Sequence, residues 1–376
     1  MLILLTLLSC GRETVVNGVF TGEVLLAHCE SYRRIAVSGS VVMSLEDAAG
    51  LECLVSVSDD LTLYGTGGEA APDLLPRLEQ VGGDLTIRNA LLFPELTGLN
   101  RLEQVGGALS LTSLSALTRV DAFGGLTEVG GDLTLSSLPL LSEARALPVT
   151  RVGGSVLIYG TLLEDLGLLS SLTSLQSLGI QENSRLTDLS GLEALSSLNN
   201  TGEADDIELY IIDNAWLDDI SALSGMDWTN ADVYIGSSAA LDDLSAFSGT
   251  TAMGQVRLEP RGYTSLSGLE SLETAAELRI AGFPGLTALD GLSALREVSG
   301  QLVLFDNTLL SDLGGLASSL ERVGDLYIAG NPQLGCDEIN TLLSEIEVTS
   351  EVDIGDCDAD TDKDTDKDTG EDADTG

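Results

Sequence analysis

A segment of about 24 residues returns along most of this chain, and each return carries Leu-x-x-Leu-x-x-Leu or a close variant. The clearest copies occupy residues 186–192, 217–223 and 241–247. A short alternation of apolar and polar residues, as at residues 84–87, recurs with the same period. A fixed period of this size is typical of a solenoid, in which each repeat packs mainly against its neighbours. The chain is therefore predicted to be a repeat array rather than a set of globular domains.

Each alternating segment predicts a β-strand with one buried face. Leu85 and Ile87 alternate with Thr86, which is the two-residue period of a half-buried strand. Val-Gly-Gly precedes this segment and recurs, and glycine would allow either a tight corner or a left-handed backbone there. After each strand, apolar residues spaced by three point inward from short turns. No segment has the pattern of a long amphipathic helix.

Fourteen such strands predict about 14 coils of 22–24 residues. Their centres lie near residues 42, 62, 86, 110, 134, 157, 179, 210, 234, 257, 279, 303, 327 and 353. At a strand spacing of roughly 4.8 Å, the coils would form a rod on the order of 65 Å long. A polar excursion at residues 197–206 is interpreted as a loop on one continuous rod; a boundary between two half-arrays is the alternative.

The chain is strongly acidic. It has 376 residues and a net charge of -43, from 60 acidic and 17 basic side chains. Such a surface repels nucleic acid and anionic membranes at long range, so no nucleic-acid partner is expected. Solubility or life in salty surroundings would explain the acidity, and binding of cations or basic partners is the alternative.

The cysteines gather at the two ends of the array. Cys29 and Cys53 lie near its start, Cys336 and Cys357 lie at its far end, and none lies between. Two pairs in these places predict disulfides that staple the two caps, Cys29 with Cys53 and Cys336 with Cys357. Free buried thiols are the alternative. No C-x-x-C occurs and His28 is the only histidine, so no zinc-type site is predicted.

Residues 1–9 form an apolar run that is too short to span a bilayer and is typical of an export signal. Leu7-Leu8-Ser9-Cys10 resembles the bacterial lipoprotein lipobox, although no Lys or Arg precedes the run. That resemblance implies cleavage before Cys10 and lipidation of Cys10, with Gly11 favouring the outer membrane. An ordinary secretory signal is the alternative. Both place the mature chain outside the cytoplasm, and membrane contact would be made only through the N-terminal lipid.

The repeat itself carries a second resemblance. Val-Gly-Gly-x-Leu-x-Ile followed by Leu-x-x-Leu-x-x-Leu resembles the receptor L domain, a leucine-rich-repeat-like β-helix of growth-factor receptors and of microbial surface proteins. Residues 330–336, with Cys357 downstream, resemble the terminal cap of bacterial members, and the Leu-Asp-Asp-Leu-Ser-Ala copies resemble internalin-like repeats. The likeness covers about residues 35–357. It implies a right-handed leucine-rich-repeat-like β-helix at a cell surface, and it carries no catalytic residues.

Five segments follow from these patterns. We expect a signal peptide at 1–9, an anchor and cap at 10–34, the solenoid at 35–335, a second cap at 336–357 and a disordered Asp-rich tail at 358–376. The tail lacks the glycine and the glutamate of an EF-hand loop. Weak calcium association is the most that its composition predicts.

Stacking places the outward residue of each strand in a column, and this column changes character along the chain. Small or plain residues such as Thr86 and Thr134 fill its first half. The second half contains Tyr210, Tyr234, Arg257, Arg279 and Tyr327, named here the Tyr/Arg column. Tyr and Arg are enriched at binding hot spots, which predicts a ligand face. The alternative is structural, because such side chains also stack on each other across strands.

A second column, at the third position of the leucine pattern, is mostly acidic. It contains Glu95, Arg119, Glu143, Asp165, Asp188, Asp219, Asp243, Ser265, Ala288 and Asp312. Each Asp could accept hydrogen bonds from turn amides. Alternatively, carboxylates of adjacent coils could bind Ca²⁺, for which Asp218, Asp219, Asp242 and Asp243 are the candidate ligands. No other cofactor is predicted.

These patterns favour a lipid-anchored surface protein that recognises or adheres to an extracellular protein or polysaccharide. A passive structural component of the envelope is the alternative, and a polysaccharide-acting β-helix enzyme is a remote one. The sequence has no G-x-S-x-G, phosphate loop or Cys/His pair, so no catalytic residue is proposed. The oligomeric state and the ligand are left open.

Overall fold

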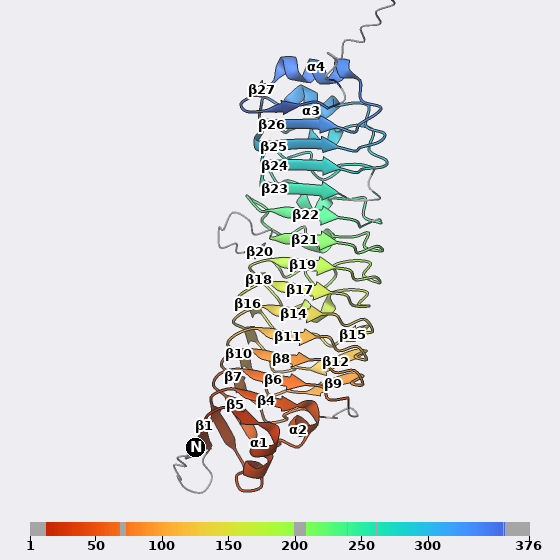
Figure 1. Ribbon diagram of the computed structural model, residues 1–376. Coiled ribbons are helices and arrows are strands. Elements are labelled where there is room, and N and C mark those ends of the chain that lie inside the picture. The colour runs from red at the N-terminus through yellow and green to blue at the C-terminus, as the bar shows by residue number, and fades with distance from the viewer. Residues whose placement is uncertain are drawn as a thin grey trace, which may run out of the picture.

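The computed structural model describes residues 13–67, 73–198, 208–238, 240–259, 262, 264–355 and 357. In this part the chain forms a tall stack of short parallel strands, with the N-terminal end at the bottom of Figure 1 and the C-terminal end at the top. The predicted signal peptide at 1–9, Cys10 and the tail at 358–376 lie outside the described residues.

The main sheet has sixteen strands, all paired in parallel. In chain order they are β2 (Phe20–Thr21), β4 (Val41–Ser44), β6 (Leu61–Tyr64), β8 (Leu85–Arg88), β11 (Leu109–Thr112), β14 (Leu133–Ser136), β17 (Val156–Tyr159), β19 (Leu178–Gln181), β21 (Leu209–Ile212), β22 (Val233–Gly236), β23 (Ala252–Glu259), β24 (Thr274–Ala281), β25 (Glu297–Phe305), β26 (Arg322–Ala329), β27 (Glu347–Val348) and β28 (Val352–Asp353). Each predicted strand centre lies in one of these strands, so the strand prediction is confirmed.

Two further parallel sheets form other sides of the stack. The second contains β1 (Thr14–Asn17), β3 (Ile35–Ser38), β5 (Leu54–Val57), β7 (Gln80–Val81), β10 (Gln104–Val105), β13 (Glu128–Val129), β16 (Arg151–Val152), β18 (Ser174–Leu175) and β20 (Ser197–Leu198). The third contains only β9 (Glu95–Gly98), β12 (Arg119–Ala122) and β15 (Glu143–Ala144). Strands β1 and β2 join their sheets before residue 35, where the sequence placed the start of the array.

The register repeats the sequence period. Leu85 lies beside Leu109, which lies beside Leu133, at steps of 24 residues. Across the predicted excursion, β19 pairs directly with β21, Leu178 beside Leu209. The stack is therefore continuous there, which makes the half-array alternative wrong. Residues 197–198 of the excursion form strand β20 rather than loop, and residues 199–206 lie outside the described residues.

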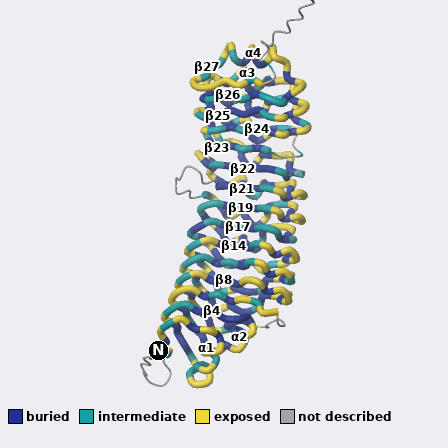
Figure 2. Tube along the Cα trace, in the orientation of Figure 1, coloured by how far each residue is buried: buried dark blue, intermediate teal, exposed yellow. Residues whose placement is uncertain are grey.

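The core is one continuous line of buried apolar residues along the stack. Buried residues are dark blue on the Cα tube of Figure 2. Leu85 and Ile87 are buried, as the alternation predicts, and Phe123, Phe247 and Phe283 are the largest fully buried side chains of the core. No single repeat could bury such a face alone, so packing against the neighbours stabilises every repeat.

The Val-Gly-Gly corner answers a question that the sequence left open. A Cβ on Gly82, Gly106, Gly130 or Gly153 would lie 2.1–2.2 Å from a carbonyl oxygen of the preceding repeat. None of these glycines has a positive φ. Glycine is required there for the close approach of two backbones, and the left-handed alternative is wrong.

The left-handed residue instead follows the strand. Seven residues at this position have φ between 52° and 58° although they are not glycines: Asn89, Ser113, Ser137, Glu182, Asp213, Ser237 and Asp306. Glycines occupy the same position at residues 160, 282 and 330, with φ of 65–73°. Such a conformation costs a non-glycine residue roughly 1–2 kcal/mol. Stacking against adjacent repeats offsets this cost in each repeat. The left-handed residue turns the chain out of the sheet.

The helices are short, as expected. They are α1 (Gly22–Cys29), α2 (Leu45–Ala49), α3 (Gly314–Ser319) and α4 (Cys336–Glu345), with 3₁₀ helices η1 (Gly167–Leu169), η2 (Ser221–Leu223), η3 (Ser245–Phe247) and η4 (Asp290–Leu292). Helices α1 and α4 lie at the two ends of the stack (Figure 1).

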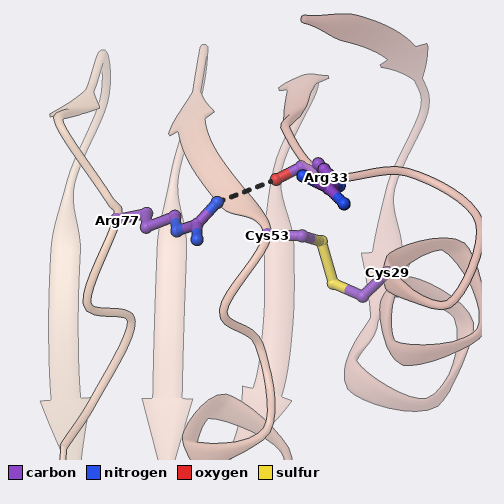
Figure 3. Close-up of a disulfide and its surroundings, with 4 residues drawn as sticks. All are labelled: Cys29, Arg33, Cys53 and Arg77. Atoms are coloured by element: carbon purple, nitrogen blue, oxygen red, sulfur yellow. Dashed lines mark hydrogen bonds between the residues drawn. A yellow bond between two sulfur atoms is a disulfide. The ribbon is translucent and has the colours of Figure 1, made fainter. Parts of the chain in front are cut away.

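Both caps contain a disulfide. Cys29, at the end of α1, is bonded to Cys53, and Arg77 donates a hydrogen bond to the carbonyl oxygen of Arg33 beside it at 3.3 Å (Figure 3). Cys336, the first residue of α4, is bonded to Cys357. The cysteines of the first pair are 24 residues apart and those of the second 21. Closing a loop of this size stabilises the fold by about 3 kcal/mol.

Candidate functional site

The parallel register brings the Tyr/Arg column together on the outward face of the main sheet. Tyr210 of β21 lies beside Tyr234 of β22, which lies beside Arg257 of β23, and Arg257 lies beside Arg279 of β24. Val303 of β25 separates Arg279 from Tyr327 of β26. These strands are stacked one above the other in the upper half of Figure 1. The predicted alignment is thus present, and its role in ligand binding stays a prediction.

The two tyrosines contact each other at the lower end of the column. Their ring centroids are 5.2 Å apart with an interplanar angle of 73°, an edge-to-face arrangement. The ring of Tyr234 leans along its own strand, because Gly236 leaves room for it: a Cβ there would lie 3.2 Å from the ring. Both rings are half-buried and leave part of their surface accessible.

Glu259 connects this aromatic pair to the arginines. The hydroxyl of Tyr234 donates a hydrogen bond to the Glu259 carboxylate at 3.1 Å, and Nε of Arg279 donates to the same carboxylate. Burial, together with the charge and hydrogen bond of Glu259, raises the pKa of Tyr234 to about 12. Burial also raises the pKa of Tyr210, with a smaller effect from the charge of Asp213.

The contacts continue to the upper strands. The guanidinium carbon of Arg279 lies 5.9 Å from the ring centroid of Phe305, whose ring lies 6.0 Å from that of Tyr327. Val303 lies in the outward column but is buried, with 4% of its surface exposed. These side chains stack on each other, as the structural interpretation predicts. They also leave an accessible aromatic and cationic surface, as a ligand face requires.

Arg257 is held by its own neighbours. Its Nη2 donates a hydrogen bond to the side-chain oxygen of Gln255 at 2.8 Å and lies 3.8 Å from Glu277. The side chain nevertheless keeps 42% of its surface exposed, compared with 37% for Arg279. Both guanidinium groups are therefore fixed in position and reachable from solvent.

Sequence reasoning missed the second outward position of the same strands. Residues two positions after the column lie on the same face, because side chains alternate along a strand. This position contains Tyr64, Arg88, Tyr159, Glu259 and Phe305. With it, five of the seven tyrosines lie on this face: Tyr64, Tyr159, Tyr210, Tyr234 and Tyr327. The period-two rule alone would have found them.

The acidic column is structural in its later part. Asp165, Asp188, Asp219, Asp243 and Asp312 each accept a hydrogen bond from the backbone N–H two residues ahead, at 2.7–2.8 Å. This confirms the turn-amide interpretation for these residues. Hydrogen bonds from Ser221 lower the pKa of Asp219. The earlier members Glu95, Arg119 and Glu143 instead lie side by side in the three-stranded sheet, with Arg119 3.7 Å from Glu143.

The calcium candidates do not assemble into a site in the part of the chain that the structure describes. No group of three or more His, Cys, Asp or Glu side chains there could hold a metal ion. Asp219 and Asp243 use a carboxylate oxygen for their turns, and Asp218 and Asp242 lie exposed beside them. Calcium binding by these four residues stays a prediction.

Sequence reasoning also missed two series of side chains that recur from repeat to repeat: buried asparagines just after the strands and aspartates just before them. Asn183, Asn214, Asn307 and Asn331 are almost fully buried just after their strands. The Asn214 amide donates to the carbonyl oxygens of Ile180 and Ile212, and its oxygen accepts from the backbone and side chain of Asn183. Asp84 and Asp132, just before their strands, accept the backbone N–H of the next repeat at 2.8 Å. The recurrence of asparagine at a fixed position after a strand is the sequence signal that could have revealed the first series.

Hollows of the described surface lie away from the Tyr/Arg column. One, of about 600 Å³, lies beside the Cys29–Cys53 disulfide and includes Tyr32, Arg33 and Arg77 in its lining. Another, of about 500 Å³, is lined by polar groups such as Asn100 and Arg101. The lining residues of both belong to the first repeats, whereas the column belongs to the later ones.

No family model matches this chain, and no curated protein sequence matches it. Among the described residues, no helix is both long and apolar enough to cross a membrane. The geometry of the main sheet is therefore the basis on which a function can be proposed.

Proposed function

We propose that this protein is a surface recognition protein whose partner, an extracellular protein or glycan, lies across the outward face of β21–β26. The observation that carries the proposal is the Tyr/Arg column. Its tyrosine rings and guanidinium groups are half-exposed. Tyr210 packs against Tyr234, Glu259 joins Tyr234 to Arg279, and Gln255 holds Arg257. Side chains that are already ordered lose little conformational freedom on binding, and Tyr and Arg dominate binding hot spots.

The proposal includes the finer fold and the location. The period, the parallel sheets and the turns support a right-handed leucine-rich-repeat-like β-helix of the receptor L-domain kind. The two disulfides support an extracytoplasmic location. Lipidation of Cys10 would tether the rod to the envelope, with its recognition face several repeats away from the anchor.

A passive structural role is the second candidate, and one observation favours it. The column residues satisfy each other through Tyr234–Glu259–Arg279 and Arg257–Gln255 contacts, which would also stiffen the stack in the absence of a ligand. The two candidates make opposite predictions about substitutions that leave the fold intact.

The test is capture of envelope proteins and of an immobilised glycan panel by the purified protein. A variant with Tyr210, Tyr234, Arg257 and Arg279 changed to Ser would be compared with the wild type, after circular dichroism has verified equal strand content. A ligand retained by the wild type and lost by the variant would support recognition. Equal behaviour of the two proteins would support the passive role.

A further inference from the structure

We propose that the ligand is a linear, uncharged polysaccharide that lies along the rod, across the strands, from Tyr159 on β17 to Tyr327 on β26. This inference rests on the proposed function and names the ligand class of the same face. It also adds Tyr159 to the site. Three observations carry it: the spacing of the groups, the kind of side chains on the face and the charge around them.

The spacing suits a polymer of repeating units. From β17 to β26 the main sheet runs through β19, β21, β22, β23, β24 and β25 without interruption. These eight strands span roughly 34 Å at a strand spacing of about 4.8 Å. That spacing is comparable to the length of one sugar unit in an extended glycan. Outward side chains on different strands would therefore meet different sugar rings, with gaps at Gly179 of β19 and at the buried Val303 of β25.

The side chains suit sugars better than a protein surface. Protein interfaces are centred on exposed apolar anchors that become buried. Among the described residues the most exposed large apolar side chains include Leu91, Leu92, Trp216 and Leu309. All of these lie in the turns that follow the strands. Between β17 and β26 the face instead offers half-exposed tyrosine rings, which can pack against the C–H groups of a pyranose.

Polar groups lie beside those rings at fixed positions. A guanidinium carries five N–H donors in a planar fork, and only Nε of Arg279 takes part in its hydrogen bond to Glu259. Arg257 is oriented by Gln255 and Glu277. Donors and acceptors held in this way match the neighbouring hydroxyl groups of a sugar. Tyr159, whose pKa is raised by a hydrogen bond and the charge of Glu182, repeats the ring-and-carboxylate arrangement at the lower end.

The charge excludes anionic polymers. Carboxylates of Glu259, Glu277 and Asp325 lie on the same strands as the column, Asp232 directly precedes β22, and the whole chain carries a net charge of -43. A uronic-acid or sulfated polymer would be repelled at long range. A neutral glycan has no such penalty.

The test measures binding of the full-length protein to cellohexaose, xylohexaose, mannohexaose and the hexamer of N-acetylglucosamine, each with its disaccharide, by calorimetry. We expect at least one hexasaccharide to bind and its disaccharide to bind much more weakly, because the longer chain meets more of the face. Tyr159→Ala and Tyr210→Ala should each weaken binding about tenfold, equivalent to about 1.4 kcal/mol. Tyr64→Ala is the matched control, since it removes an exposed tyrosine of the same sheet outside the site.

Arg257→Gln should also weaken binding. Because this substitution removes no aromatic ring, its effect cannot be attributed to the loss of an aromatic packing contact. Binding that is equal for a disaccharide and a hexasaccharide, or unaffected by Tyr159→Ala, would overturn the lengthwise placement. Binding only to polygalacturonic acid or heparin would overturn the charge argument. If no glycan binds but an envelope protein is captured and lost in the serine variant, recognition survives and the polysaccharide inference fails. If neither binds, both fail.

Discussion

The repeats before Thr161 and those after it have the same period but connect to their neighbours differently. In the earlier repeats that contain β8, β11 and β14 the third side is a strand, β9, β12 or β15, and Leu114 and Leu138 fill the position two residues after β11 and β14. In the later repeats Asp-initiated turns lead into η1, η2 and η3, and asparagines occupy that position after β19, β21, β25 and β26, whereas Ser238 and Phe283 occupy it after β22 and β24. Side chains there take over hydrogen bonds that backbone pairing makes in the earlier part.

This difference shows how the same repeat can form two different third sides of the stack. An Asp can accept the N–H two residues ahead and start a tight turn, whereas Glu95, Arg119 and Glu143 lie in extended strands and pair across the sheet. The buried asparagines add hydrogen bonds between repeats, which help to fix the register beside the backbone pairing of the main sheet. The half that is stabilised by side chains is also the half that contains the Tyr/Arg column.

The largest effect is expected for Asn214→Leu, which makes a later repeat resemble an earlier one at the position two residues after the main strand. The substitution leaves the buried Asn183 N–H and the Ile180 carbonyl oxygen without their partner, and each such group costs about 2 kcal/mol. The free energy of unfolding in urea should fall by about 4 kcal/mol. The reciprocal Leu138→Asn, which buries an amide among leucines, should also destabilise. A neutral result for Asn214→Leu would mean that the two kinds of repeat are interchangeable.

Gly106→Ala tests the backbone approach of the earlier repeats. The new Cβ would lie 2.2 Å from the Gly82 carbonyl oxygen, so the two repeats must separate, at a cost of about 3 kcal/mol. Gly106 is exposed to solvent, so its exposed fraction gives no sign of this close backbone contact. Gly225→Ala is the control, since a Cβ there meets nothing within 4 Å and φ is not positive. Thermal unfolding of the two variants should differ clearly; equal melting temperatures would contradict the packing argument.

Asp219→Ala tests the turn of the later repeats and its pH dependence. Loss of the hydrogen bond from the Ser221 N–H should lower the free energy of unfolding by about 1 kcal/mol near neutral pH. Because the folded state lowers the pKa of Asp219, the stabilisation is present above the unfolded value of 3.8 and is lost as the pH falls through the folded pKa. Urea unfolding at several pH values should therefore show a gap between wild type and variant that closes in acid. A gap that persists unchanged would assign the effect to something other than the ionised carboxylate, and Asp219→Asn, which keeps the acceptor, should cost less.

The smallest effect is expected for Tyr234→Phe, which tests the hydrogen bond between the Tyr/Arg column and Glu259. Below pH 10 the variant loses only one partly exposed hydrogen bond, worth about 0.5 kcal/mol. The folded state raises the pKa of Tyr234 from 10.0 to about 12, so its contribution is complete below pH 10 and is lost as the pH rises towards 12. A tyrosinate absorbance titration should lose its latest phase in Tyr234→Phe. Retention of that phase would show that another phenol is the protected one.

Much of the architecture could be predicted because it depends on periodicity. Alternation at Leu85 and Ile87 and its return every 24 residues or so place the strands, and the end positions of the cysteines predict the two pairs. The side-chain partners could not be predicted in the same way. Glu259 lies two strand positions after Arg257, and only the pairing of β22, β23 and β24 puts it between Tyr234 and Arg279.

The sequence by itself determined the period, the buried face of each strand and the alignment of the Tyr/Arg column, because stacking copies a linear pattern into space. Only the tertiary structure decided why Val-Gly-Gly needs glycine and which asparagines bridge repeats. It likewise decided that the acidic column forms turns in the later repeats and pairs strands in the earlier ones. The physical reason is that a contact between repeats depends on two residues far apart in the chain, and their distance and orientation exist only once the backbones have stacked.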